Sequence, residues 1–249
     1  MATDTLTGAL EKAAEPKETA SVRDLLDRLK PEIERALCEP DAAERIMRYY
    51  LTAIRYSPPL RQCTAESLAA ACLISAQVNL EPGPIGYVYF IPRGTECVWM
   101  MGYTGIIEQA RRSGASGLRS TIVWDCDRYV APWENERGLH WELKSGAPAD
   151  RKERVAVLVA WKADGLWQAI DVPADRIERA KNASPAFKAR SGPWLTDEDA
   201  MWRKTGVRAA RPFLPMSPQF AQAVSADDAI VHGIEVVEQT AQPILEAAE

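Results

Sequence analysis

The sequence has few histidines and none of the short motifs on which many enzymes depend. It contains two histidines in 249 residues, and neither lies in a cluster with cysteines. The patterns G-x-x-x-x-G-K-[S/T], G-x-G-x-x-G and G-x-S-x-G do not occur. A P-loop nucleotide site, a dinucleotide-binding turn and a Ser-His-Asp hydrolase therefore lack support. A structural zinc site is not expected either, and no cofactor is indicated.

The five cysteines do not form a recognisable framework. Their number is odd and no C-x-x-C is present. The N-terminus shows no signal-peptide pattern, and no apolar run approaches the roughly 20 residues that cross a bilayer. We therefore expect reduced thiols in a cytoplasmic protein that makes no membrane contact.

Basic residues are absent from residues 213–249, which carry six acids. The formal net charge of −5 argues by itself against a nucleic-acid binder. Residues 1–45, however, hold 7 basic and 11 acidic side chains, whereas residues 46–212 hold 23 and 18. An acidic envelope thus surrounds a mildly basic body, although both ends could equally be solvated tails.

The order of the expected elements indicates an α+β fold, with antiparallel strands and hairpins packed against helices and a helical N-terminal region. We expect a disordered tail over 1–20, one domain over 21–226 and an acidic, flexible tail over 227–249. The expected helices cover 21–30, 41–56, 64–78, 104–112, 173–181, 196–211 and 217–224. The expected strands cover 85–91, 96–101, 119–125, 139–144, 154–162 and 166–172. Thr196 with Asp199 resembles a capping box, and 182–193 is expected to be a mobile loop.

One group of residues is compatible with bond-breaking chemistry. Asp125 and Asp127 precede Glu142 and Lys144, and the latter pair lies on an expected strand. Carboxylates of this kind hold Mg²⁺ in many nucleases, with a lysine that stabilises charge on the attacked phosphate. The spacing is permissive, because alternate polar residues also face solvent on half-buried strands. A magnesium-dependent nuclease is therefore an alternative reading of the chain.

The helix expected from Thr196 carries a stripe of cations. Lys204, Arg208 and Arg211 are spaced so that they share one face, while Arg203 lies beside that stripe. Such a stripe can follow a phosphate backbone and release its counterions. It can also be a solvated face whose cations suit a helix C-terminus.

Further cations are interleaved with aromatic residues, as in proteins that bind single strands. Arg111 and Arg112 end a short helix, where the helix dipole offers a structural explanation for them. The expected loop is bracketed by basic residues and followed by an aromatic one: Lys181, Lys188, Arg190 and Trp194. Aromatic residues also gather near the first hairpin, where they could be either base platforms or core: Tyr87, Tyr89, Trp99 and Tyr103.

Three blocks of motif-like residues follow one another along the chain. Leu80-Glu81-Pro82 and then Gly86 to Pro92, with the pattern L-x-P…G-x-x-Y-x-x-P, resemble a segment of the RecT family of phage single-strand annealing proteins. The next blocks are similar to its G-Y-x-G…A-R-R-S-G motif: Gly102 to Ile107 and Ala110 to Gly114. A third set resembles its G-P-W…M-x-x-K-T-x-x-R…L-P block: Gly192-Pro193-Trp194, Met201, Lys204-Thr205, Arg208 and Leu214-Pro215. The resemblance extends from about Val22 to about Ala226, and residues 227–249 show no motif that aligns.

The resemblance implies an ATP-independent recombinase that binds single-stranded DNA and pairs it with a complementary strand. It further implies a homo-oligomer, either a ring or a helical filament, that holds DNA and the annealed duplex. The expected protein partners are an exonuclease that exposes the single strand and a host single-strand binding protein.

Annealing makes and breaks no covalent bond, so we expect nonspecific contacts to the backbone and the bases. The phosphate contacts expected from the basic clusters are Arg111, Arg112, Lys204, Arg208 and Arg211, beside Lys181 and Arg203. Lys188 and Arg190 are expected on a flap over the groove, next to Trp194. Tyr103 either contacts a base or sugar, or packs the turn between Gly102 and Gly105.

Overall fold

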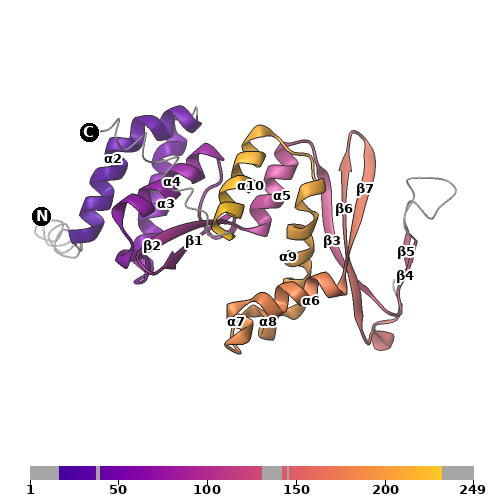
Figure 1. Ribbon diagram of the computed structural model, residues 1–249. Helices are drawn as coiled ribbons and strands as arrows, with labels where there is room; N and C mark the ends of the chain where they lie inside the picture. Colours follow the sequence, from indigo (N-terminus) through magenta and orange to yellow (C-terminus); the bar gives the residue numbers. More distant parts are fainter. Residues whose placement is uncertain (1–16, 38–39, 131–141, 145, 232–249) are drawn as a thin grey trace, which may run out of the picture. The chain divides into compact units, whose positions relative to one another are not determined.

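The computed structural model describes residues 17–37, 40–130, 142–144 and 146–231, and these belong to two compact units (Figure 1). One unit contains residues 1–105 and 218–249, and the other contains 106–217. Helix α5 (Tyr103–Arg112) crosses the boundary between them. The combination of helices with antiparallel strands confirms the α+β fold. In the described part of the chain, no helix has both the length and the apolar character needed to cross a membrane.

The first unit packs four helices with one hairpin. Its elements are α2 (Lys17–Leu37), α3 (Pro40–Tyr56), η1 (Leu60–Gln62), α4 (Ala65–Gln77), β1 (Val88–Arg93), β2 (Glu96–Met101) and α10 (Pro218–Val231). The largest wholly buried side chains form its core, and they include Leu26, Ile46, Tyr50, Trp99 and Phe220. Residues from both ends of the sequence therefore build one hydrophobic core.

Helix α2 is longer than the sequence suggested. It begins at Lys17, inside the segment expected to be disordered, and it continues through Pro31 to Leu37. A proline inside a helix removes one backbone hydrogen bond and costs about 3 kcal/mol. The apolar stripe nevertheless continues beyond it, because Ile33 and Leu37 are both buried, as Leu29 is before the proline. Burial of these side chains offsets the cost of the proline.

Buried polar groups tie α4 and α10 to strand β2. The Ser67 hydroxyl accepts the Cys97 amide at 2.9 Å, and the Trp99 indole donates to the Ser75 hydroxyl at 2.9 Å. Asp227 is fully buried, and its carboxylate accepts the Met101 amide at 3.0 Å. Helix α10 continues to Val231, past residue 227, where the acidic tail was expected to begin. The rest of that tail lies outside the described residues.

The second unit is built on a three-stranded antiparallel sheet of order β3-β6-β7. Its strands are β3 (Ser116–Trp124), β6 (Arg154–Ala163) and β7 (Leu166–Pro173), and β4 (Arg128–Val130) pairs separately with β5 (Glu142–Lys144). Its helices are α6 (Ala174–Ala183), α7 (Pro185–Lys188), α8 (Pro193–Thr196) and α9 (Glu198–Ala210), with 3-10 turns η3 (Pro148–Asp150) and η4 (Arg211–Phe213). The expected β6–β7 hairpin is present, and it turns at Asp164 and Gly165, both with positive φ.

Helix α9 packs tightly on this sheet. A Cβ atom at Gly206 would lie 2.4 Å from Cγ1 of Val157, so only glycine allows this approach. The Ser120 hydroxyl donates to the Arg203 carbonyl at 3.1 Å and joins β3 to the same helix. Trp202 and Val207 complete the buried side of the helix. The sheet thus fixes both the position and the rotation of α9.

The stretch 182–193, which was expected to be a mobile loop, includes helical residues. It contains α7, whose N-terminus is capped by the Ser184 hydroxyl, and it ends at Gly192, which has φ +84°. The expected capping box is also displaced by one residue. Asp197 rather than Thr196 caps α9, and its carboxylate accepts the Ala200 amide at 3.0 Å.

Candidate nucleic-acid interface

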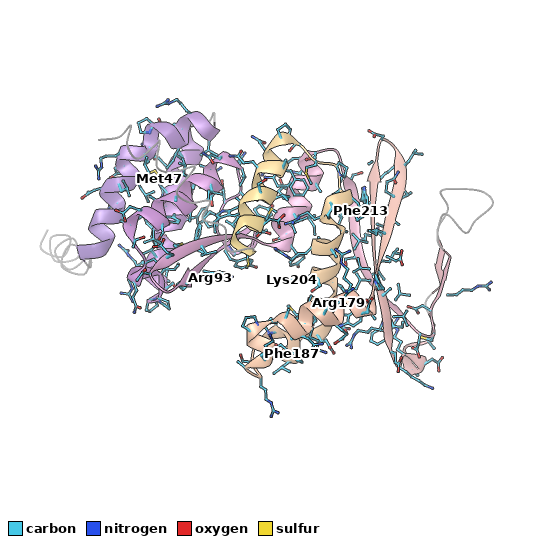
Figure 2. The ribbon with its side chains drawn as sticks, viewed as in Figure 1. Met47, Arg93, Arg179, Phe187, Lys204 and Phe213 are labelled. Atoms are coloured by element: carbon cyan, nitrogen blue, oxygen red, sulfur yellow. The ribbon has the colours of Figure 1, made fainter. Side chains whose placement is uncertain are left out.

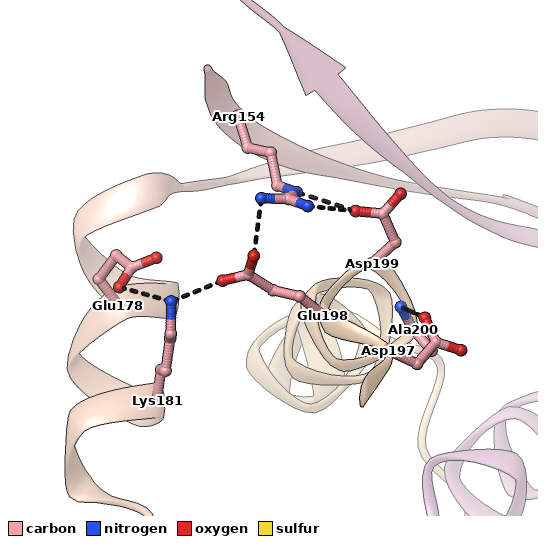
Figure 3. Close-up of polar contacts among 7 residues, drawn as sticks. All are labelled: Arg154, Glu178, Lys181, Asp197, Glu198, Asp199 and Ala200. Carbon is pink, nitrogen blue, oxygen red and sulfur yellow. Dashed lines mark hydrogen bonds and ion pairs between the residues drawn. The ribbon is translucent and has the colours of Figure 1, made fainter. Parts of the chain in front are cut away.

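Ion pairs at the start of α9 anchor this helix to its neighbours (Figure 3). The Arg154 guanidinium, from β6, bonds to Asp199 at 2.6 Å and to Glu198 at 2.9 Å. Lys181, from α6, bonds to Glu198 and approaches Glu178 to 3.6 Å. The first turn of α9 therefore has its acids neutralised by cations of β6 and α6.

Two of the expected DNA contacts, Lys181 and Trp194, lie among the residues that hold α9 in place or in the interior of the unit. The Lys181 side chain is 17% exposed, and its hydrogen bond to Glu198 raises its pKa. Trp194 is 5% exposed on α8, so its ring belongs to the interior of the unit. The structure therefore does not present Trp194 as a surface on which a base could stack.

The second half of α9 and the turn after it carry the remaining cations of the expected stripe. Arg203 is exposed, whereas Lys204 and Arg208 are half-buried. Lys204 lies two residues, or about 200°, from the sheet-facing Gly206, so it projects from the opposite side of the helix. Figure 2 shows Lys204 on this helix. Arg208 follows it by one turn, and Arg211 continues the series in the half-buried first position of η4.

The electrostatics of Lys204 distinguish it from an ordinary surface lysine. Burial lowers its pKa, and the positive charge of Arg208 lowers that pKa further. Within the described ranges, no hydrogen bond or ion pair joins Lys204 to an acid. Two cations at i and i+4 repel one another, so this arrangement disfavours the protein without a ligand. A bound anion would relieve both the burial penalty and the repulsion.

Arg111 and Arg112 share one acid. The Glu108 carboxylate accepts two hydrogen bonds from Arg111, at 2.8 and 2.9 Å, and one from Arg112 at 2.8 Å. These bonds, that of Arg111 first, lower the pKa of Glu108. The Arg111 side chain remains 65% exposed and can still reach a ligand. Glu108 stands three and four residues before the arginines, a spacing from which this pairing was foreseeable.

Lys188 and Arg190 are both exposed at the end of α7. Arg190 has φ +51°, in the left-handed region that favours glycine. The Ser191 amide donates to the Ala186 carbonyl at 2.9 Å, which closes α7 in the manner of a Schellman motif. An arginine at this position retains a strained conformation that glycine would relieve, and such strain is often associated with function.

Tyr103 begins α5 in the first unit and is 38% exposed. The adjacent glycines are structural, because a Cβ at Gly102 would lie 2.0 Å from the Gly86 carbonyl oxygen. At Gly105 the corresponding distance to the Tyr87 carbonyl oxygen would be 2.3 Å. The tyrosine is thus presented on a tightly packed turn, in a different unit from α9.

The two aspartates of the possible nuclease site serve the local backbone. Asp127 accepts the amides of Trp124 and Gly146, each at 2.8 Å. Asp125 accepts the Lys152 amide at 3.0 Å, and this bond contributes most to the lowering of its pKa. In the backbone register of β4 and β5, Lys144 stands opposite Arg128. Among the described residues, no group of three or more His, Cys, Asp or Glu side chains could hold a metal ion.

An α+β protein with a run of cations along one helix is of a class suited to binding an anionic polymer. Comparison with known proteins identifies the class further. The RecT family model matches residues 44–243, and the chain belongs to this family. It is 30% identical over 211 residues to Protein RecT of Escherichia coli (strain K12), covering 80% of this chain and 77% of that protein.

Family membership assigns the chain to DNA-binding proteins of single-strand annealing recombination. The matched region begins later than the expected limit at Val22 and ends later than Ala226. It therefore includes much of the acidic segment that carried no recognisable motif.

Proposed function

We propose that the chain anneals complementary DNA strands without ATP, and that α9 holds one strand by its phosphates. The observation that carries this proposal is geometric: Lys204 and Arg208 lie half-buried and one turn apart, on the side of α9 opposite the sheet-facing Gly206. A phosphate is a ligand that stabilises neighbouring cations of this kind. Arg203, Arg211 and Arg111 extend the same chemistry, and Arg190 adds a cation at the end of α7.

Holding a strand by its backbone leaves the base edges free for pairing. Arginine and lysine contacts to phosphates carry no sequence information, which suits a protein that must accept any sequence. Base pairing then supplies the specificity, and the protein needs no metal ion or nucleotide for the reaction. In this proposal the chain acts as a ring or a helical filament in the bacterial cytoplasm, beside an exonuclease and a host single-strand binding protein.

Annealing of complementary oligonucleotides in EDTA, without nucleotide, tests the function directly. We expect duplex formation by the full chain under these conditions. Magnesium-dependent strand degradation that disappears in Glu142→Ala would contradict the proposal and support a nuclease.

The position of the strand is tested by Lys204→Ala combined with Arg208→Ala. Each phosphate contact to a single strand contributes about 0.7 to the slope of log K against log salt, so we expect the slope to fall by about 1.4. The control is Arg176→Ala with Arg179→Ala, which removes the same charge from the exposed side of α6. Equal losses in both variants would show that net charge, and not the α9 site, determines binding.

A further inference from the structure

The sheet of the second unit has a face that points away from α9. Val157 faces α9, and side chains alternate along a strand, so Ala160 and Lys162 of β6 point the other way. Trp167 stands directly opposite Lys162 on β7, and Arg119 stands opposite Ala160 on β3. The side chains of Lys162, Trp167 and Arg119, one from each strand, therefore share one face of the sheet. We call it the outer face.

Trp167 is unusual among the tryptophans that the structure describes. It is 41% exposed, whereas Trp124 is half-buried and Trp99, Trp161, Trp194 and Trp202 are each at most 5% exposed. Its six-membered ring lies against Gly117, across the central strand: a Cβ at Gly117 would be 3.3 Å from its Cη2 atom. Gly117 has φ +60° and lies at an irregularity in the register of β3. The bulge and the glycine thus provide a seat for the ring on the surface.

The charges beside this ring are positive. Lys162 and Arg119 are both exposed. Arg119 lies on the neighbouring strand β3, opposite Ala160, and Ala160 is two residues, or about 7 Å, from Lys162 along β6. The acid on the same face is Asp171, which is half-buried and four residues, or about 13 Å, along β7 from Trp167. An exposed aromatic ring with neighbouring cations is the combination that binds single-stranded nucleic acid by stacking and backbone attraction.

We propose that the outer face is a second DNA-contact surface, on which a base stacks on Trp167 while Lys162 and Arg119 contact phosphates. This inference rests on the proposed function, and it adds base contact to the phosphate contact of α9. The sheet and α9 itself separate the outer face from Lys204, so the two surfaces bind different nucleotides. One of them can hold the first strand while the other contacts the remainder of that strand or the incoming one.

Tryptophan fluorescence tests the stacking directly, with an unstructured oligothymidylate as the probe. Stacking quenches the indole, so the DNA-induced quenching of the wild-type protein should exceed that of Trp167→Phe. The phenylalanine variant should bind with nearly wild-type affinity, because its ring can still stack. Trp167→Ala should bind about 5- to 150-fold more weakly, as expected for the loss of one stacked base.

Two further variants complete the experiment. Arg119→Ala with Lys162→Ala should lower the salt slope by about 1.4, as for two single-strand phosphate contacts. Leu166→Ala, which removes a 51% exposed side chain next to Trp167, is the control and should bind as the wild type does. Circular dichroism establishes that each variant is folded. If Trp167→Ala does not fold, the quenching of Trp167→Phe and the salt slope of the double variant still decide the question.

The inference is overturned if Trp167→Phe retains the full quenching, or if folded Trp167→Ala retains wild-type affinity. It is also overturned if Trp167→Ala changes the oligomeric state without DNA, as measured by sedimentation, because the face would then bind a second copy of the chain. Failure of the proposed function is a separate result. It would appear as a wild-type protein that does not anneal, or as unchanged binding after the loss of Lys204 and Arg208.

Discussion

Lys204→Met should weaken DNA binding and stabilise the protein at the same time. Methionine has a similar length and a good helix propensity, so it can fill the space that the lysine stem occupies. The substitution removes a charge that burial and Arg208 both disfavour. A residue retained only for the fold would produce the opposite effect on stability.

The magnitudes follow from the surroundings of the lysine. A repulsive pair at i and i+4 costs about 0.2–0.5 kcal/mol, and partial burial disfavours the charge further. We therefore expect the free energy of unfolding to rise by about 0.5–1 kcal/mol, a typical gain when a strained functional group is removed. The loss of one charge-assisted contact to a phosphate should weaken single-strand binding by about 1.5–3 kcal/mol, or roughly 10- to 150-fold.

The pH dependence gives an independent test of the same lysine. The folded protein releases the Lys204 proton at a lower pH than the ordinary value of 10.5. The unfolded state binds more protons in this interval, so the contribution of Lys204 to stability rises with pH. The stability advantage of Lys204→Met should therefore be largest below the folded pKa and vanish above 10.5. Single-strand affinity should fall over the interval in which the lysine loses its charge.

Urea unfolding and fluorescence-anisotropy titrations at two salt concentrations measure these quantities. Lys204→Arg is the matched control, since a guanidinium stays charged and should remove the alkaline loss of affinity that this lysine causes. If Lys204→Met lowers stability, or leaves both affinity and salt slope unchanged, Lys204 is not a phosphate contact.

Three other substitutions test the supporting structure. Arg190→Gly should leave the protein equally stable or stabilise it by up to about 1 kcal/mol, because φ is +51° there; single-strand affinity should fall, and unchanged affinity in titrations would remove Arg190 from the interface. Gly206→Ala should destabilise the protein by about 1–3 kcal/mol in urea unfolding, since its Cβ would meet Val157; an unaffected midpoint would contradict the close packing of α9. Asp197→Ala should cost about 1 kcal/mol through loss of the helix cap, and a thermal melt that does not change would assign the cap elsewhere.

Local patterns predicted most of the elements because they depend on nearby residues. Asp164-Gly165 predicted the turn of the β6–β7 hairpin, and the apolar spacing predicted the bounds of α3 to within one residue. Pro31 misled the prediction because its cost is local, whereas the burial of Ile33 and Leu37 depends on distant partners. The same reason explains α10, whose extension to Val231 includes the buried contact of Asp227 with Met101.

The candidate site was predicted as a set of residue types rather than as an arrangement. The stripe of α9 followed from helical periodicity, and the structure places Lys204 on the side of the helix opposite Gly206. The spacing of residues in the sequence could not show that Lys181 forms an ion pair within the fold, unlike the proposed binding cations, because its partner Glu198 lies 17 residues away. Nor could it show that Trp194 is buried while Trp167 is exposed, since each has a leucine as one direct neighbour and a polar residue or a proline as the other.

The distribution of acids explains how a chain of net charge −5 can present a cationic surface. In the second unit, Glu198 and Asp199 are paired with Arg154, and Glu108 is paired with two arginines. Other carboxylates bond to backbone amides: Asp125, Asp127 and Asp197. These acids are neutralised or occupied by the fold itself, so they compete weakly with DNA for the cations. The half-buried Lys204 lies beside Arg208, so for the proposed site we expect local pairing, rather than the sum over the sequence, to set the charge that DNA meets.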